Sequence, residues 1–268
     1  HVEQSRYPLS FAQSRMFFIE RFEQGSSAYH IPGLLKLRAD VDMVSLSQAM
    51  QQVIVRHPVL TSVYRSDEDN EVYQLVQDVP VQIASHECVN EADFQACVSE
   101  HIHKPFDLSH EPSIRVYHYR VGGASGAQYL LLLWHHIGMD GWSLDVFINE
   151  LTLAYEGLTR GEAAELPHLS ITYGDYALWQ REYLSGEAGQ EQLAYWRGQL
   201  SGYENLTLPT DYERPAKVDY RGADYLFRLD EGLSGQLREL ARARGTTLYT
   251  VALSALYATL YKLSGQRD

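Results

Sequence analysis

The stretch LLLLWHHIGMDGWSLDV, residues 130–146, joins an apolar run to a polar loop and then to a helix-like pattern. The run at 129–134 is apolar on both faces, which favours a central strand in a sheet covered on both sides. His135 and His136 follow where that strand would end. Because side chains alternate along a strand, at most one of the two points toward a given pocket. We expect His136 to project from the strand end and His135 to be structural.

The loop after the histidines carries further polar groups. Asp140 lies close enough in the turn to fix the loop by hydrogen bonding or a salt bridge, and Gly141 lets the backbone pass near a ligand. A helix is expected over about 144–159, with Ser143 as its N-cap and its partial positive end near His136. An imidazole with nearby N–H donors permits acyl transfer without requiring it.

Two other chemistries are excluded by the same residues. Gly138 and Gly141 make a helix improbable between His136 and Asp140, and no third zinc ligand follows at a recognisable offset. The chain has no Cys-x-x-Cys pair and no Gly-x-Ser-x-Gly elbow. We therefore predict neither a metal site nor a serine hydrolase.

Chain length, net charge and cysteine count narrow the class of protein further. The chain has 268 residues, enough for one large domain or two modest ones, and 22 basic against 35 acidic side chains give a net charge of −13. That balance argues against a nucleic-acid partner and against an anionic membrane surface. No apolar run is long enough to span a bilayer. Only Cys88 and Cys97 are present, which favours a reducing, cytoplasmic setting.

The rest of the chain predicts a mixed α/β protein, a sheet with flanking helices. Ser10 followed by Gln13 is a capping-box pattern before a first helix at 11–22. Asp42 and Asn90 are expected to cap two further helices that stop before prolines. Strands are expected at 31–38, 60–66, 71–77, 80–85, 113–120, 128–134 and 223–230. The later helices are expected at 171–184, 190–200, 233–245 and 247–263.

Several motifs together resemble one family. HHIGMDGWS resembles the His-His-x-x-x-Asp-Gly signature of nonribosomal peptide synthetase condensation domains and their acyltransferase relatives. SFAQSRMFF is similar to the first motif of that family, at Ser10, Ala12, Gln13, Arg15 and Met16. YGDYALWQ is similar to its fourth motif, at Tyr173, Asp175, Tyr176, Ala177 and Trp179. LPTDYERP, residues 208–215, resembles a segment usual in the family.

The chain also departs from the family pattern. RHPVLTS, residues 56–62, has Pro58, Thr61 and Ser62 where the second motif usually carries Glu, Arg and Thr. These positions, like Arg56 and His57, are expected to be structural. The later motifs do not follow before Asp268, so the chain looks truncated. The resemblance implies that one of them supplies an arginine partner for Asp140.

The resemblance implies a V-shaped, two-lobed fold like chloramphenicol acetyltransferase. The first lobe, with the His-His motif, would be whole over 1–175, and the second would only begin at 176–268. It also implies an amide-bond-forming acyltransferase of antibiotic biosynthesis and secondary metabolism. Donor and acceptor peptidyl carrier proteins, within adjacent synthetase modules, would bring both substrates on 4′-phosphopantetheine arms, and the domain itself would bind no cofactor.

The resemblance assigns roles to the loop. His136 would lie nearest the acceptor amine, while His135 and Asp140 hold the loop and the Gly141 N–H faces the thioester oxygen. Trp142 and Ser143 resemble the variant that is common where the donor is an L-residue. Arg15 would face the tunnel or the protein surface.

Three alternatives remain open. The first is an epimerization domain on the same fold. The second is a non-catalytic docking module that recruits carrier proteins or tailoring enzymes. The third is an excised fragment that cannot turn over alone.

Tyr173, Tyr176 and Trp179 have helical spacing, so packing is favoured over substrate contact for them.

Overall fold

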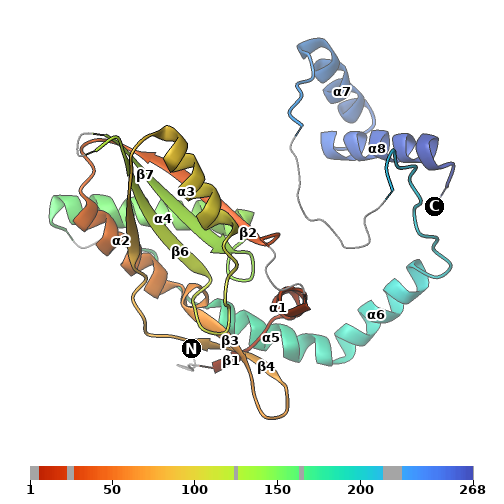
Figure 1. Cartoon of the computed structure of the whole chain (residues 1–268). Coiled ribbons are helices and arrows are strands. Elements are labelled where there is room, and N and C mark those ends of the chain that lie inside the picture. Colours follow the sequence, from red (N-terminus) through yellow and green to blue (C-terminus); the bar gives the residue numbers. More distant parts are fainter. Residues whose placement is uncertain (1–5, 23–26, 124–125, 163–165, 214–224, 268) are drawn as a thin grey trace. The chain divides into compact units, whose positions relative to one another are not determined.

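The computed structural model describes residues 6–22, 27–123, 126–162, 166–213 and 225–267 (Figure 1). The chain forms two compact units, His1–Gln190 and Glu191–Asp268. Each unit is described by itself below. The lobe boundary expected after residue 175 stays a prediction.

The main sheet of the first unit has four strands in the order β2-β7-β6-β5 (Figure 1). They are β2 (His30–Leu37), β5 (Ile83–Cys88), β6 (Ile114–Val121) and β7 (Ala127–His135). β7 pairs antiparallel with β2 and with β6, and β5 pairs parallel with β6. β7 is therefore an interior strand, as its apolar sequence predicts.

Alternate residues of β7 enter two separate cores. Leu132 and Trp134 pack with α2 (Met43–Arg56) and α4 (Gly141–Arg160) on one face of the sheet. Leu131 and Leu133 pack on the other face, with residues of α1 (Phe11–Phe22) and α3 (Glu91–His103). Because both faces are covered, all four leucines at 130–133 are at most 1% exposed. This is the physical reason for a strand without polar alternation.

A second, three-stranded sheet has the order β1-β4-β3. It consists of β1 (Arg6–Pro8), β3 (Ser62–Ser66) and β4 (Val72–Val76). The hairpin predicted around residues 67–70 is the β3–β4 connection. A short helix, η1 (Pro58–Leu60), precedes β3, so the predicted stop of the preceding helix at Pro58 is confirmed. The mixed α/β architecture, a chloramphenicol acetyltransferase-like lobe with flanking helices, is the one expected.

The later helices are close to those expected. They are α5 (Tyr173–Ser185), α6 (Glu187–Gln199), α7 (Glu231–Ala243) and α8 (Leu248–Ser264). Gly174 in α5 has a packing reason, since a Cβ there would come within 2.7 Å of the Tyr7 ring. Among the helices in the described part of the chain, none has the length and apolar character needed to cross a bilayer.

The strand predicted at 223–230 is wrong for its described residues, 225–230, which are irregular. Tyr225, Leu226 and Phe227 are 88%, 95% and 72% exposed. The segment is rich in apolar residues, but a strand needs a hydrogen-bonded neighbour. No described strand pairs with this segment.

Candidate functional site

The loop after β7 is built around the imidazole of His135. The ring is fully buried, and its Nδ1 accepts a hydrogen bond of 3.1 Å from the backbone N–H of Ile137. In that arrangement Nδ1 carries no proton, so the ring proton is on Nε2. Nε2 lies 3.5 Å from the Glu20 carboxylate. The Gly138 N–H donates to the His135 carbonyl at 3.1 Å and closes the turn. His135 is thus part of the frame of the loop.

His136 lies on the opposite side of the chain. Its side chain is exposed and lines a cavity, whereas His135 does not line it. The backbone N–H of His136 donates to the Tyr29 carbonyl at 2.8 Å, which fixes the position of its Cα at the strand end. The two rings therefore separate as strand alternation predicts.

Two further contacts hold the loop from outside. Gln13 is buried, and its side-chain amide donates to the Ile137 carbonyl at 3.3 Å. Its Oε1 accepts from the Ser10 N–H, while the Ser10 hydroxyl accepts from the Gln13 N–H, so the predicted capping box is confirmed. Gly138 approaches Ser113 so closely that a Cβ would lie 2.3 Å from the Ser113 hydroxyl. Any side chain at 138 would displace the loop.

The predicted N-cap of the following helix is wrong. α4 begins at Gly141, and Asp140 is its N-cap. The Asp140 carboxylate accepts from the Ser143 N–H at 2.8 Å and from the Ser143 hydroxyl at 2.6 Å. These hydrogen bonds, the hydroxyl first, hold the pKa of the Asp140 carboxyl below its ordinary value, and nearby His136 acts in the same direction. Ser143 supports the cap from inside the first turn.

Of the remaining predicted site residues, some line the cavity and others do not. Trp142 and Ser143 line the cavity together with His136 and Asp140, although Trp142 is 85% exposed. Gly141 does not line it, but a Cβ at this first helical position would meet no atom within 4 Å. The space beside the Gly141 backbone is therefore open. Arg15 is exposed on α1 and lies outside the cavity lining.

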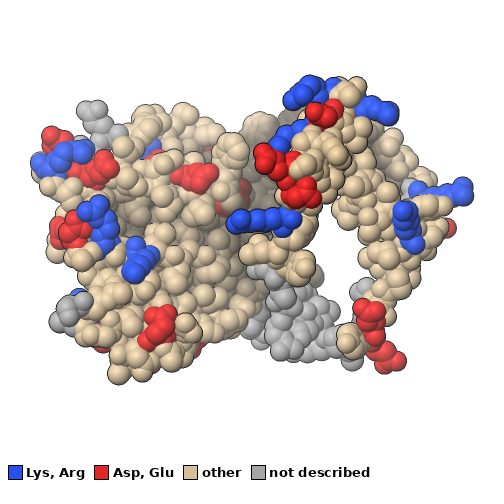
Figure 2. Space-filling model, turned by 90° about the horizontal axis from the view of Figure 1, so that it is seen from above, with Lys and Arg blue, Asp and Glu red and all other residues tan. Residues whose placement is uncertain are grey.

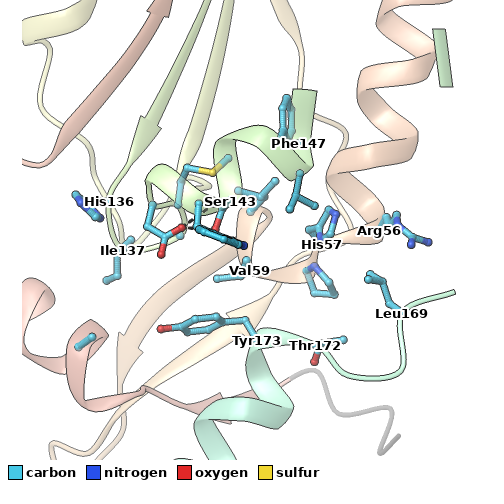
Figure 3. Close-up of a pocket in the computed structure, with 18 of the residues that line it drawn as sticks. Arg56, His57, Val59, His136, Ile137, Ser143, Phe147, Leu169, Thr172 and Tyr173 are labelled. Atoms are coloured by element: carbon cyan, nitrogen blue, oxygen red, sulfur yellow. Dashed lines mark hydrogen bonds between the residues drawn. The ribbon is translucent and has the colours of Figure 1, made fainter. Parts of the chain in front are cut away.

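The cavity has a volume of about 340 Å³. In Figure 3, His136 and Ile137 lie at one end of it, and Leu169 and Arg56 at the other. Phe147 of α4 and Tyr173 of α5 face the space between these ends. Sites for small organic groups begin at about 300 Å³, so one compact group fits here.

Arg56 and His57 line the far end and share one buried acid. Glu150 is 6% exposed, and its two carboxylate oxygens lie 3.0 Å from Arg56 Nε and 2.6 Å from His57 Nε2. Arg56 also donates to the Pro167 carbonyl. Sequence reasoning took Arg56 and His57 as structural and missed Glu150. The available signal was an acidic residue within the buried face of α4.

The arrangement permits orientation of an amine. An exposed imidazole projects from a loop held at several points, beside the positive end of a 20-residue helix. No group of three or more His, Cys, Asp or Glu side chains in the described residues could hold a metal ion.

A family model for the condensation domain matches residues 3–268. This chain belongs to the condensation domain family. One of the linear gramicidin synthase subunits of Brevibacillus parabrevis is 36% identical over 279 residues, covering 99% of this chain and 5% of that protein. The chain therefore spans a small part of this curated relative. The recognition of the family from its motifs is confirmed.

Two solved structures share the fold. The X-domain in its complex with OxyB from teicoplanin biosynthesis has a TM-score of 0.88 and 28% identity, covering 98% of this chain and 58% of that one. The first condensation domain of the CDA synthetase has a TM-score of 0.73 and 20% identity, covering 98% and 63%. At that identity the second similarity shows the fold alone.

Asp140→Ala should lower the free energy of unfolding by about 0.5–2 kcal/mol, because the N-cap of α4 is lost. Asp140→Asn, which keeps an accepting oxygen, should change it little. Since the folded-state pKa of Asp140 is lowered, the advantage of the native carboxylate is present above the pKa of an unfolded aspartate. It should disappear as the pH falls through the lowered value. Urea unfolding of the three proteins at several pH values measures this, and equal losses for Ala and Asn would contradict the cap.

Glu150→Ala should cost about 3–5 kcal/mol, because it leaves the Arg56 guanidinium with no acidic partner in a largely buried position and also removes the hydrogen-bond partner of His57. The matched control on the same helix is Glu156→Ala, which removes an exposed pair with Arg160 and should cost less than about 1 kcal/mol. Urea unfolding compares the two, and a similar small loss for both would contradict the buried ion pair.

Proposed function

We propose that this domain forms an amide bond between two carrier-bound substrates. The acceptor aminoacyl amine attacks the carbonyl carbon of the donor acyl or peptidyl thioester. The C–N bond forms, the C–S bond breaks, and the leaving thiolate takes up the proton that the amine loses. The observation that carries this proposal is the exposed His136, projecting from a fixed loop into a cavity, in a member of the condensation domain family.

His136 is proposed to orient the amine and to stabilise the charged intermediate. A free α-amino group has a pKa of about 8, so an appreciable minority is already neutral at cytoplasmic pH. General-base help contributes about a hundred- to ten-thousand-fold, whereas orientation of two tethered reactants contributes about 7–11 kcal/mol. Positioning therefore outweighs proton abstraction.

The neighbouring residues support that geometry in the proposal. His135 and Asp140 hold the loop, and the Gly141 N–H, beside open space, faces the thioester oxygen. Trp142 and Ser143 match the motif variant that is common where the donor is an L-residue, so an L-configured donor is proposed. Arg15, exposed and outside the cavity, takes no part in the chemistry.

Both substrates are proposed to arrive on 4′-phosphopantetheine arms of donor and acceptor peptidyl carrier proteins, in the cytoplasm, within adjacent synthetase modules. The domain needs no bound cofactor of its own. Neither nucleic acid nor a membrane is proposed as a partner. On the face shown in Figure 2, basic and acidic side chains are interspersed without a continuous basic patch, and the net charge is −13.

The test mixes two loaded carrier proteins with the synthetase that carries this chain and, in parallel, with the 268-residue chain. Intact mass should reveal a dipeptidyl thioester with the synthetase. His136→Ala should slow its formation about a hundredfold or more, with carrier binding unchanged. The control is His103→Ala, an exposed histidine on α3 outside the cavity. Product from the synthetase alone would mean that the shorter chain cannot turn over by itself.

Three results would overturn the proposal. Inversion of one α-carbon without peptide bond formation would indicate an epimerization domain. Carrier or enzyme binding without either product would indicate a docking module. A solvent isotope effect that reports rate-limiting proton transfer at His136 would contradict its role in orientation.

A further inference from the structure

The cavity extends beyond the group that the proposed chemistry uses. Its far end, away from His136, includes Leu169 beside Arg56 and His57 (Figure 3). The apolar side chains of the cavity lining as a whole include Val59, Met139, Val146, Phe147, Leu169 and Ile171. An amine held at His136 needs none of them. This part of the cavity could therefore bind a group that peptide bond formation itself does not require.

The basic side chains at the far end already have an acidic partner. Arg56 and His57 line the cavity, but both contact the carboxylate of Glu150 behind it, at 3.0 Å and 2.6 Å. A carboxylate entering the cavity would have to compete with Glu150 for them. The acidic residue in the lining is Asp140, which belongs to the His136 loop and whose carboxylate already accepts from Ser143, so an ammonium group farther along the cavity would have no acidic partner in the lining. Burying either charge without a partner is costly, so the cavity favours a neutral apolar group.

The size of the cavity limits the occupant. About 340 Å³ is near the lower end of the range for small-molecule sites, enough for one large side chain and its α-carbon. A chain of several residues would not fit. His136 lies at one end of the cavity (Figure 3), so a substrate whose reacting centre is at that imidazole would extend its own side chain along the apolar lining.

We infer that the cavity is a specificity subsite that takes the large apolar side chain, of the leucine or phenylalanine class, of an aminoacyl thioester whose α-carbon lies at His136. This rests on the proposed function. The donor and the acceptor are both aminoacyl thioesters, so the same chemistry could come from either. The test separates them.

The probes are aminoacyl pantetheine amides, which cannot be hydrolysed as thioesters are, carrying leucyl, phenylalanyl, alanyl, aspartyl or lysyl groups. Their free-amine forms represent the acceptor, and their N-acetyl forms represent the donor. Calorimetry with the synthetase that carries this chain should show leucyl and phenylalanyl probes binding at least tenfold more tightly than alanyl. Aspartyl and lysyl probes should bind no better than alanyl. If the free-amine probes show the preference for large apolar side chains, the cavity binds the acceptor. If the N-acetyl probes show it, the cavity binds the donor.

Val146→Phe fills the cavity from α4, where Val146 is 41% exposed, so the change leaves the core intact. It should weaken leucyl binding about tenfold or more and leave alanyl binding unchanged. Leu153→Phe is the matched control, because Leu153 is 47% exposed on the same helix and does not line the cavity. Leu169→Trp fills the cavity from the segment that precedes α5 and should reproduce the effect of Val146→Phe.

Equal affinity for leucyl, alanyl and aspartyl probes would overturn the inference, and so would unchanged leucyl binding in both filled variants. Either result leaves the proposed function standing if dipeptide formation still depends on His136. Conversely, the leucyl preference could disappear in the filled variants while the synthetase forms no dipeptidyl product. That result would support the specificity subsite and refute the proposed peptide bond formation.

Discussion

A buried imidazole at the end of a central strand is the constraint on which the site depends. His135 has no exposed surface, so both ring nitrogens need partners within the protein. The Ile137 N–H satisfies Nδ1, and that bond requires the chain to turn immediately after the strand. With His135 directed inward, the next side chain must project the other way. The exposure of His136 is therefore a consequence of the burial of its neighbour.

The loop is held by parts of the chain that are far apart in sequence. Gln13 binds it from the first helix, Ser113 contacts it at Gly138, and the Asp140 cap joins it to α4. A loop restrained at several points keeps a side chain in one place without further ordering when substrates arrive. This is the property needed by a residue that acts by orientation, since misplacement of a reacting group by about 1 Å can cost a hundredfold in rate.

Much of the fold could be predicted because its signals are local. The apolar run at 129–134 predicts an interior strand, and the Ser10–Gln13 pair predicts a helix start, since the groups that satisfy each other are three residues apart. The choice between Asp140 and Ser143 as cap could not be made from spacing. Both residues are good caps, and only the backbone geometry shows which oxygen reaches which N–H. The strand predicted at 223–230 failed over its described residues, 225–230, for a related reason, because pairing depends on a neighbouring strand that local sequence does not specify.

The features that define the cavity are long-range and could not be predicted. Glu150 lies more than ninety residues from Arg56 and His57 in sequence, and nothing local indicates that one carboxylate serves both. In the sequence, Gly138 likewise looks like an ordinary loop glycine. Only the structure shows that Ser113, twenty-five residues earlier in the chain, packs against it and leaves no room for a side chain. The motif identifies the reacting loop, and the packing of α2 against α4 determines what lies beside it.

The most direct measurement is the tautomer of His135, determined by nitrogen-15 NMR of the histidine side chains. The structure predicts an unprotonated Nδ1 that accepts a hydrogen bond from the Ile137 amide, with the proton on Nε2 facing Glu20. A protonated Nδ1, or the absence of a hydrogen bond from that amide, would mean that the buried imidazole does not shape the loop. The account of how His136 reaches the cavity would then be wrong.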